Sequence, residues 1–380
     1  MKIALGTLFL NPGKLGGLEN YARGLIRGLS RIDSKNEYVI LANQENYTTW
    51  TDLPRNFTVH LCPIQGTKKL QRIYYEKYSL GKVLQELQAD LYHSMAFGFP
   101  PKTKNIPTII TIGDIIFKRF PQDLGFLQRW AMHLSVWYSC RNTQRIVTFS
   151  EYSKKDLAEE YNVSLEKIDV ALLANNELRE KQEEAETYFK QHQIPEQYIF
   201  SVASTYHHKN LKGLLKAFSL LKQNQNVPHS LIVTGLKMAG HQEFFQMIEE
   251  YHLQKHVFFT GWISEAVLLQ LYQKASCFVY PSFYEGFGLP VLEAMVARVA
   301  VVSANTTSLP EVYGKAALSF DPHNPLDIAE KIYQCLSDHS LRKELIENGY
   351  EQAQRFSWAK CASETLKSYQ QTKEQFSGSK

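Results

Sequence analysis

One stretch decides the fold of this chain: Pro281-Ser-Phe-Tyr-Glu-Gly-Phe-Gly-Leu-Pro-Val-Leu-Glu-Ala-Met295, whose layout is strand, loop and helix. Pro290 suits the first helical turn, because its fixed φ fits a helix and its missing N–H is not needed there. Gly286, Phe287 and Gly288 come just before it and present backbone N–H groups at a positive helix end. Such an end attracts phosphate groups or sugar hydroxyls, so the stretch predicts a ligand-binding loop.

Two glutamates enclose this loop. Glu285 lies in the loop and Glu293 about one turn into the helix, so both carboxylates can reach one ligand from the same side. As isolated residues they would merely complement the helix dipole. Together with the glycines between them, they predict acceptors for pairs of ligand hydroxyls.

Around this stretch, short β-branched runs alternate with amphipathic segments, which is the pattern of parallel βαβ units. A polar segment between Leu173 and Tyr198 separates two such series, and 380 residues suit two domains of ~100 to 200 residues each. Each series predicts an α/β domain with a doubly wound sheet, in which ligands bind beyond the carboxyl ends of the strands. The predicted strands are 2–10, 38–42, 58–61, 91–93, 108–112 and 145–149, then 198–203, 230–234, 256–260, 277–279, 299–303 and 317–320.

The Glu-x7-Glu motif in its Gly-rich setting resembles the retaining glycosyltransferases of family 4, and the resemblance covers nearly the whole chain. It implies the GT-B fold, with two facing Rossmann-like domains. Residues 1–185 would form an acceptor-side domain and residues 196–356 a nucleotide-sugar-binding domain. A returning C-terminal helix, residues 357–371, would cross back to the first domain.

The same resemblance places the crossing point at Phe356-Ser357-Trp358. Tyr369 would then touch the first domain, and residues 372–380 would be disordered. Truncation after Gln371 is therefore expected to be silent.

A second motif follows the strand at 198–203. Lys209 stands near a helix start, and Lys209-Asn210-Leu211 matches the family's Lys-Asn-Leu pattern. A Lys there is a compact cation suited to a diphosphate leaving group. His207 and His208 stand just upstream, where many relatives have an Arg, and adjacent histidines seldom hold one metal ion.

A third motif, Gly13-Lys-Leu-Gly-Gly-Leu-Glu-Asn-Tyr21, joins the first strand to the first helix and resembles the family's Gly-Gly loop at Gly16 and Gly17. Glycines let donor phosphates or the acceptor approach the backbone closely. The stretch does not match the dinucleotide fingerprint, and Gly235 to His241 lacks the Lys-Ser/Thr of a nucleotide triphosphate loop. Dehydrogenase and kinase activities are therefore not expected.

One segment departs from the family. Residues 107–117 look like its Thr-x-His-Asp segment, but Gly113 stands where a His is usual, at a strand end facing the donor sugar. In relatives that His helps to position and stabilise the reacting centre. Here this role would pass to Asp114 or His93, or activity would be reduced. If the site is otherwise intact, Gly113→His is expected to raise the rate of transfer.

The resemblance implies transfer of a sugar from a nucleotide-diphosphate donor to an acceptor hydroxyl, with retention and no cofactor. Glu293 would hold the ribose hydroxyls, Glu285 the donor sugar, and the backbone from Phe287 to Leu289 the sugar and phosphate. The chain contains no Asp-x-Asp sequence, so no metal is expected. Lys209, the helix N-terminus at Gly286 to Leu289 and Arg298 are the candidates to carry the leaving-group charge. The departures at 113, 208 and 298 leave a second hypothesis open, a weak or inactive partner protein that binds a sugar nucleotide.

Composition places the protein among ordinary soluble folds, with 44% hydrophobic and 21% charged residues. Five scattered cysteines favour neither a disulfide framework nor zinc. No signal peptide or spanning helix is predicted, so a cytoplasmic location is expected, and no motif indicates nucleic acid. Up to residue 180 there are 23 Lys and Arg against 18 Asp and Glu, and after it 19 against 20, so the first half is the more basic.

This bias is compatible with a second possibility, that the first domain makes peripheral contact with the inner membrane face. In the stretch from Thr67 to Tyr78, basic residues are interspersed with aromatic residues. A second stretch carries large apolar residues at helical spacing, a pattern that also fits a core helix. Its residues are Phe126, Leu127, Trp130, Leu134, Trp137 and Tyr138.

Overall fold

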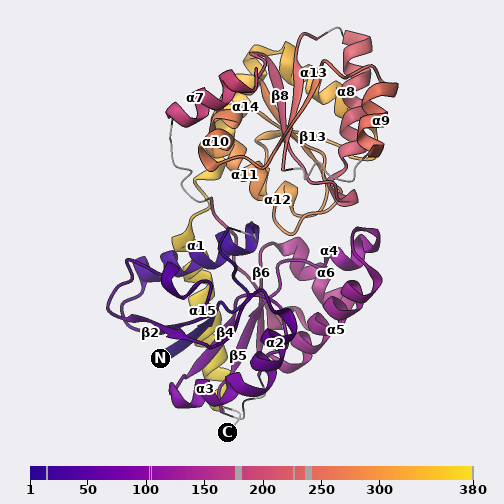
Figure 1. Cartoon of the computed structure of the whole chain (residues 1–380). Coiled ribbons are helices and arrows are strands. Elements are labelled where there is room, and N and C mark those ends of the chain that lie inside the picture. The colour runs from indigo at the N-terminus through magenta and orange to yellow at the C-terminus, as the bar shows by residue number, and fades with distance from the viewer. Residues whose placement is uncertain are drawn as a thin grey trace. The chain divides into compact units, whose positions relative to one another are not determined.

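The computed structural model describes residues 1–13, 16–101, 103, 105–175, 182–225, 227–235 and 242–378, and the structural statements below concern these. The chain forms two compact units, one of Met1–Ala174 with Phe356–Lys380 and one of Asn175–Arg355 (Figure 1). The first unit ends earlier than residue 185. Helix α7 (Gln182–Gln191) packs against α10 (Glu265–Lys274) and so belongs to the second unit.

The first unit is built on a parallel sheet of order β3-β2-β1-β4-β5-β6-β7. Its strands are β1 (Lys2–Gly6), β2 (Glu37–Ala42), β3 (Phe57–Leu61), β4 (Leu91–Ser94), β5 (Thr108–Thr111), β6 (Arg145–Thr148) and β7 (Ile168–Val170). Its helices are α1 (Gly17–Ile32), α2 (Lys69–Tyr74), α3 (Leu80–Glu86), α4 (Ile116–Arg119), α5 (Phe126–Asn142), α6 (Glu151–Tyr161) and α15 (Trp358–Gly378), with a π turn at Tyr75–Ser79 between α2 and α3.

The central strands of this sheet are buried because helices cover both faces. All four residues of β5 and of β6 are buried. The sequence pattern predicts these strands but not β7, whose three residues are too few for a periodic signal. It also extends β1 to residue 10, whereas the strand ends at Gly6.

The second unit repeats this architecture with a parallel sheet of order β10-β9-β8-β11-β12-β13. Its strands are β8 (Tyr198–Val202), β9 (Ser230–Thr234), β10 (Val257–Gly261), β11 (Cys277–Tyr280), β12 (Val301–Ala304) and β13 (Ala317–Phe320). Its further helices are α8 (Leu211–Gln225), α9 (Gln242–Glu250), α11 (Leu289–Val296), α12 (Leu309–Tyr313), α13 (Pro325–Ser337) and α14 (His339–Ala353).

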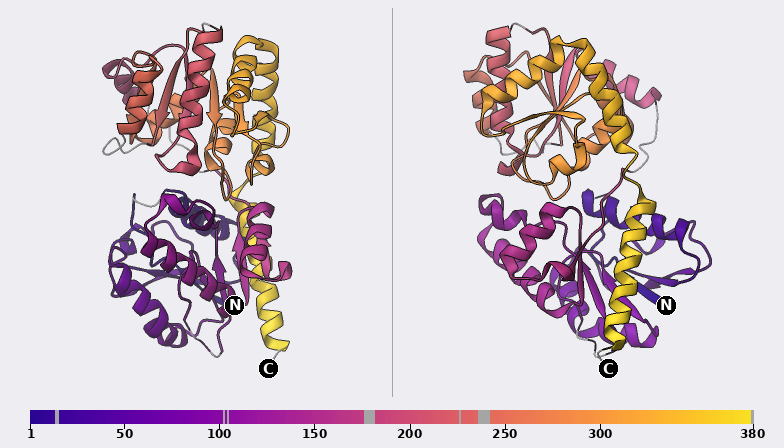
Figure 2. Two further views of the ribbon diagram at one scale, coloured as in Figure 1. Left: turned by 90° about the vertical axis from the view of Figure 1, so that its right-hand side faces the viewer. Right: turned by 180° about the vertical axis from the view of Figure 1, so that it is seen from behind.

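The last helix of the chain, α15, completes the first unit (Figure 2). It packs against α1, where Gly24 and Gly28 leave room for the ring and the backbone carbonyl of Trp358; a β-carbon at either glycine would overlap them. The helix continues beyond residue 371. Thr372 is fully buried and the Lys373 ammonium lies 2.8 Å from the Asp90 carboxylate, so the prediction that residue 372 and those after it are disordered is wrong for the described part of that tail.

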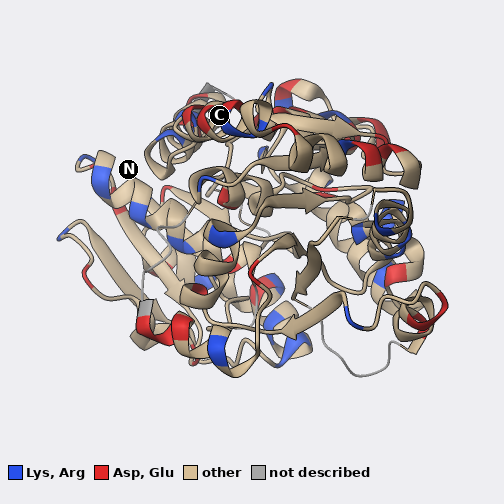
Figure 3. Ribbon diagram, turned by 90° about the horizontal axis from the view of Figure 1, so that it is seen from above, with Lys and Arg blue, Asp and Glu red and all other residues tan. Residues whose placement is uncertain are grey.

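Figure 3 marks on the ribbon the positions of Lys and Arg and those of Asp and Glu. Positions of both signs occur along the described chain, whose full sequence has a net charge of +4.

Candidate functional site

The loop between β11 and α11 forms the centre of the candidate site. Gly288 precedes the helix with a φ of +112°, and a β-carbon there would lie 2.7 Å from Cδ2 of Leu309, so this position requires glycine. Leu289 begins the helix and Pro290 occupies its first turn, as predicted. The positive end of α11 therefore faces the loop that carries Glu285.

Glu285 lies at the centre of a cluster of polar side chains. Its Oε1 lies 2.6 Å from Nζ of Lys209 and accepts a hydrogen bond of 2.8 Å from the Tyr280 hydroxyl. Lys209 also donates to that hydroxyl over 2.9 Å, which closes a triangle of three side chains. The sequence-predicted carboxylate and ammonium are thus in direct contact, although they lie 76 positions apart in the chain.

The charge state of Glu285 follows from its neighbours. Burial is the largest single influence and raises the pKa of this carboxyl, but the charges of Lys209 and His208 and the hydrogen bonds from Lys209 and Ser282 together lower the pKa below its usual range. Glu285 is therefore a carboxylate at neutral pH. Its side chain is only 12% exposed.

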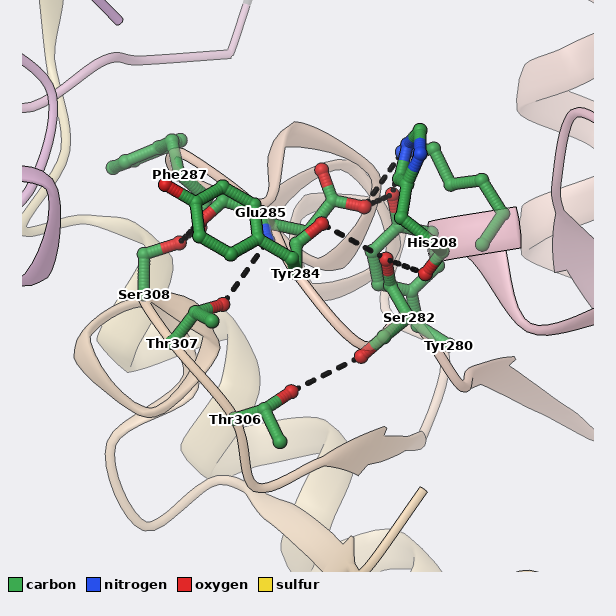
Figure 4. A network of polar contacts seen from close by, with 10 residues as sticks. His208, Tyr280, Ser282, Tyr284, Glu285, Phe287, Thr306, Thr307 and Ser308 are labelled. Atoms are coloured by element: carbon green, nitrogen blue, oxygen red, sulfur yellow. Dashed lines mark hydrogen bonds and ion pairs between the residues drawn. The ribbon is translucent and has the colours of Figure 1, made fainter. Parts of the chain in front are cut away.

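Hydroxyl groups that follow β12 hold the loop in place (Figure 4). The Thr307 hydroxyl accepts a hydrogen bond from the Glu285 amide over 3.0 Å, and the Ser308 hydroxyl donates to the carbonyls of Glu285 and Phe287. Thr306 donates to the Ser282 carbonyl over 3.0 Å. The loop conformation is thus fixed by a neighbouring strand end.

Lys209 is placed by the turn that follows β8. The turn His207–Lys209 ends at Asn210, which has a φ of +52°. The Asn210 side chain donates to the carbonyls of Pro281 and Pro322, at 3.1 and 2.8 Å, and the His208 carbonyl accepts from the Phe283 amide. These bonds tie the turn that carries Lys209 to the loop that carries Glu285.

Glu293 lies inside α11 and is held by a second phenol. The Tyr272 hydroxyl donates to its Oε2 over 3.0 Å, and burial raises the pKa of the Glu293 carboxyl. The Tyr280 hydroxyl, by contrast, donates to Glu285, and its pKa is raised by burial first, then by the charge of Glu285 and its hydrogen bond, with a smaller contribution from the charge of Glu293. Each predicted acceptor is thus held by a tyrosine hydroxyl.

Arg298 does not join this group. It lies at the C-terminal end of α11, the opposite end from Gly288, where its guanidinium stacks 3.7 Å from the ring centroid of Tyr350 and lies 3.3 Å from the Glu347 carboxylate. The expectation that it carries leaving-group charge is wrong.

In the first unit, the glycine loop leads into α1. Gly16 has a φ of +47° and Gly17 is the first helical residue. Ahead of them, the Gly13 amide donates to the Glu19 carboxylate over 2.9 Å. Lys14 and Leu15 lie outside the described residues.

Gly113 follows β5, and a phenylalanine fills the space beside it. A β-carbon at Gly113 would lie 2.6 Å from Cε2 of Phe149, so a histidine side chain does not fit there without moving that buried ring. Asp114 accepts a hydrogen bond from the amide of Ile116, the first residue of α4, over 3.0 Å. The expectation that Gly113→His raises transfer is not compatible with this packing.

His93 cannot replace the missing histidine, because it is fully buried in β4. Its Nδ1 lies 2.7 Å from the Tyr369 hydroxyl and its Nε2 lies 2.8 Å from the Thr111 hydroxyl, which in turn meets the Tyr21 hydroxyl. Burial lowers the pKa of His93 to about 3. The ring is a neutral member of a buried polar chain that joins α15 to the sheet.

Two family models together match most of the chain. Residues 184–352 match the model described as glycosyl transferases group 1, and residues 15–171 match glycosyltransferase family 4. O-antigen chain mannosyltransferase B of Escherichia coli is 32% identical over 289 residues, which cover 75% of each chain. This protein belongs to glycosyltransferase family 4.

Solved structures share the fold of this family 4 glycosyltransferase, which is GT-B. Sucrose-phosphate synthase of Thermosynechococcus elongatus superposes with a TM-score of 0.73 at 18% identity, over 98% of both chains. HepE of Anabaena, solved in complex with UDP and glucose, gives 0.69 at 18% identity over 97% of this chain and 99% of that one.

Some residues of the site are not predicted from the sequence. Thr306, Thr307, Ser308, Tyr272 and Tyr280 form the hydrogen bonds around the two glutamates, yet none of them belongs to the motifs of this glycosyltransferase that the sequence singles out. The signal that could have found the first three is their position directly after β12, since parallel strand ends meet at one edge of a sheet.

Within the described ranges, no group of three or more His, Cys, Asp and Glu side chains is arranged to hold a metal ion. Among the same residues, no helix combines the length and the apolar character needed to cross a bilayer.

Proposed function

We propose that the protein transfers a hexosyl residue from a nucleotide-diphosphate sugar to an acceptor hydroxyl, without a metal ion and with retention at the anomeric carbon, in glycan or polysaccharide synthesis. The observation that carries this proposal is the contact of Lys209 with Glu285 in front of the N-terminus of α11. One ammonium, one carboxylate and one positive helix end suit the diphosphate and the hydroxyls of a sugar nucleotide.

Each group has a proposed role. Glu293 holds the ribose hydroxyls, Glu285 the donor sugar, and the backbone from Gly286 to Leu289 the sugar and phosphates, while Gly16 and Gly17 let a substrate approach the first unit. In the reaction the bond between C1 and the phosphate oxygen breaks and a bond from C1 to the acceptor oxygen forms on the same face. The acceptor proton passes to the departing phosphate, and Lys209 stabilises the charge that develops there.

The choice of donor follows from the relatives. A mannosyltransferase is 32% identical to this chain, and HepE was solved with UDP and glucose. A hexose is therefore the proposed donor sugar, and mannose is the first to test. Asp114 lies at a strand end in the first unit and is proposed to contact the donor sugar or the acceptor.

The binding step can be tested by thermal unfolding with UDP, GDP and ADP. A ligand at 100 times its Kd stabilises a protein by about 2.7 kcal/mol, so one of these nucleotides should raise the Tm of the wild type. Glu293→Ala should abolish this rise, whereas Glu265→Gln, a carboxylate change on the neighbouring α10, should keep it. If no nucleotide raises the Tm, the proposed function is excluded.

Two neighbouring lysines, one as the test and one as the control, allow the chemical step to be examined. Lys209→Met should lower kcat about 10- to 100-fold, because a charge-assisted contact contributes about 1.5 to 3 kcal/mol. Lys212→Met should not, because that lysine pairs with Glu243 at an exposed site one helical turn further on. Equal rates for Lys209→Met and wild type would exclude Lys209 as the phosphate cation.

A weak or inactive partner protein is the second candidate, and the Gly113–Phe149 packing favours it because it leaves no room for a histidine there. The two candidates differ in turnover, since both would bind a sugar nucleotide. Hydrolysis or transfer by the wild type that Glu285→Gln abolishes would exclude the inactive partner. Bound nucleotide without turnover of any hexose donor would support it.

We also propose that the first unit rests on an anionic lipid surface through a face formed by α2, the π turn and α5, here called the aromatic face. The buried side of α5 consists of Ser135, Val136, Ser139 and Cys140, while five large apolar residues of the stripe are exposed and Tyr138 is half-buried. This arrangement excludes the core-helix interpretation of the stripe. The exposed large residues are Leu70, Tyr74, Tyr78, Phe126, Leu127, Trp130, Leu134 and Trp137.

The two helical segments of the aromatic face are neighbours, since Nζ of Lys77 lies 5.8 Å from the ring centroid of Tyr138. Cations lie beside the exposed rings, with Arg129 against Phe126 and Arg141 against Trp137. Exposed aromatic rings with Lys and Arg among them fit the interface of an anionic bilayer.

Sedimentation with vesicles tests this surface. Wild-type protein should bind phosphatidylcholine vesicles that contain phosphatidylglycerol, and the double variant Leu127→Ser, Trp130→Ser should bind at least tenfold more weakly, since each buried apolar side chain contributes about 1.5 to 3 kcal/mol. Trp262→Ser, which changes a still more exposed tryptophan of the second unit, should bind like the wild type. Equal binding by all three proteins would contradict the proposal.

A further inference from the structure

Lys209 and Glu285 neutralise each other within the protein. Nζ of Lys209 lies 2.6 Å from Oε1 of Glu285, and the two side chains are only 20% and 12% exposed. Solvent and salt screen such a short, poorly exposed ion pair much less than a surface pair. The cation that is proposed to hold the diphosphate therefore already has an anionic partner in the protein itself.

The Tyr280 hydroxyl contacts both members of this ion pair. It accepts a hydrogen bond of 2.9 Å from Lys209 and donates one of 2.8 Å to Oε1 of Glu285. Tyr280 is buried and ends β11, so the sheet fixes the position of this hydroxyl. The hydroxyl would stay bonded to Glu285 if Lys209 turned to another partner, but it carries no positive charge to compensate the carboxylate.

The Glu285 carboxylate depends on nearby positive charge. Burial raises the pKa of this carboxyl, whereas the charges of Lys209 and then of His208, together with hydrogen bonds from Lys209 and Ser282, lower it. A poorly exposed carboxylate that loses its cation is strongly destabilised. An anion that binds Lys209 must therefore displace Glu285 or leave it beside a second negative charge.

A sugar nucleotide and a free diphosphate differ in how they meet this requirement. The diphosphate of a sugar nucleotide can take the place of Glu285 at Lys209, while a hydroxyl of its sugar takes the place of Lys209 as a hydrogen-bond donor to Glu285. A diphosphate without a sugar brings no such hydroxyl. It competes with Glu285 for one ammonium group, and its negative charge repels the carboxylate.

We propose that Glu285, through its ion pair with Lys209, weakens the binding of diphosphates that carry no sugar, so that the site distinguishes the sugar nucleotide from the nucleoside diphosphate that transfer leaves behind. Glu285 therefore favours release of the product as well as binding of the donor. The identity of donor and product rests on the proposed function, whereas the competition for Lys209 rests on the contacts alone.

Calorimetric titration with inorganic pyrophosphate tests the competition without a sugar nucleotide. Glu285→Gln removes the charge but keeps the size of the side chain, so this variant should bind pyrophosphate about tenfold or more tightly than the wild type does. The double variant Lys209→Met, Glu285→Gln should lose this gain. Glu243→Gln, which breaks the exposed pair of Glu243 with Lys212, should bind pyrophosphate like the wild type.

The same variants are titrated with UDP and UDP-glucose and with GDP and GDP-mannose. Glu285→Gln should bind the recognised nucleoside diphosphate about tenfold or more tightly than the wild type does, and the gain should be much smaller for the matching sugar nucleotide. A gain for pyrophosphate without binding of any nucleotide supports the competition for Lys209, while the proposed function fails.

The proposal is overturned if Glu285→Gln binds pyrophosphate no more tightly than the wild type does, or if the gain persists in the double variant. Equal gains for the nucleoside diphosphate and the sugar nucleotide would also overturn it. Near-UV circular dichroism checks that each variant is folded, and Glu285→Ala takes the place of the glutamine variant in every comparison if that variant does not fold.

Discussion

Gly113 and Phe149 share the space after β5, so the size of one limits the other. Gly113→Ala should lower the free energy of unfolding by about 1 to 3 kcal/mol, because its β-carbon would lie 2.6 Å from a buried ring. Urea denaturation measures this loss. In the double variant Gly113→Ala, Phe149→Leu, the free energy of unfolding should be close to that of Phe149→Leu alone. A loss in the double variant equal to the sum of the two single losses would show that the two residues do not compete for space.

The buried His93 predicts a pH dependence of stability. Its pKa is about 3 when folded and about 6.5 when unfolded, so below pH 6.5 the unfolded state binds more protons. Its contribution to stability is therefore complete above pH 6.5 and declines as the pH falls towards 3, by up to about 1.4 kcal/mol per pH unit. Urea denaturation at pH 7, 6 and 5 should show a steeper decline for wild type than for His93→Asn, and parallel slopes would exclude this role.

Sequence motifs identify individual residues only where the signal is local. Glu285 and Glu293 share one motif, and Lys209 lies in another, so their types and spacing predict them. Tyr280 and Thr307 act through contacts that the folded sheet creates, and their residue types are common in any strand or loop. His93 has a type that suggests catalysis, but its burial, which no local pattern reveals, makes it structural.

At the scale of elements, α15 makes a testable contribution beyond residue 371. Truncation after Gln371 removes the buried Thr372 and the Lys373–Asp90 pair, so it should lower the free energy of unfolding by about 1 to 3 kcal/mol. Truncation after Phe376 keeps both groups and should leave the Tm within about 1 °C of the full chain. Equal Tm values for the two truncated chains would contradict this account.

Sequence periodicity predicts the existence of a helix or strand well. It predicts the ends of that element and its buried face less well. The stripe on α5 has the spacing of a core helix, yet Leu127 is 81% exposed and the helix packs through small residues. The start of α15 is visible in the sequence, whereas its length depends on contacts with α1 and with Asp90 that are remote in the chain.

At the scale of the whole molecule, the two units differ in how the chain builds them. The second is continuous, Asn175–Arg355, whereas the first combines Met1–Ala174 with the C-terminal segment. Residues 175–355 produced alone should therefore fold and keep the nucleotide-dependent rise in Tm. Residues 1–174 alone should lack near-UV circular dichroism, because α1 and His93 lose α15, and adding 356–380 through a flexible linker should restore it. A well-folded 1–174 fragment would contradict this.

The packing of Trp358 against Gly24 and Gly28 also sets an order of events on the ribosome. The chain segment between α1 and α15 takes on the order of 20 to 70 s to synthesise at ~5 to 20 residues per second. The glycine face of α1 therefore stays uncovered until α15 has been synthesised, by which time the whole sequence of the second unit has been translated. A premature stop in the codons for α15 would release a chain whose second unit is complete and whose first unit exposes its core to chaperones and proteases.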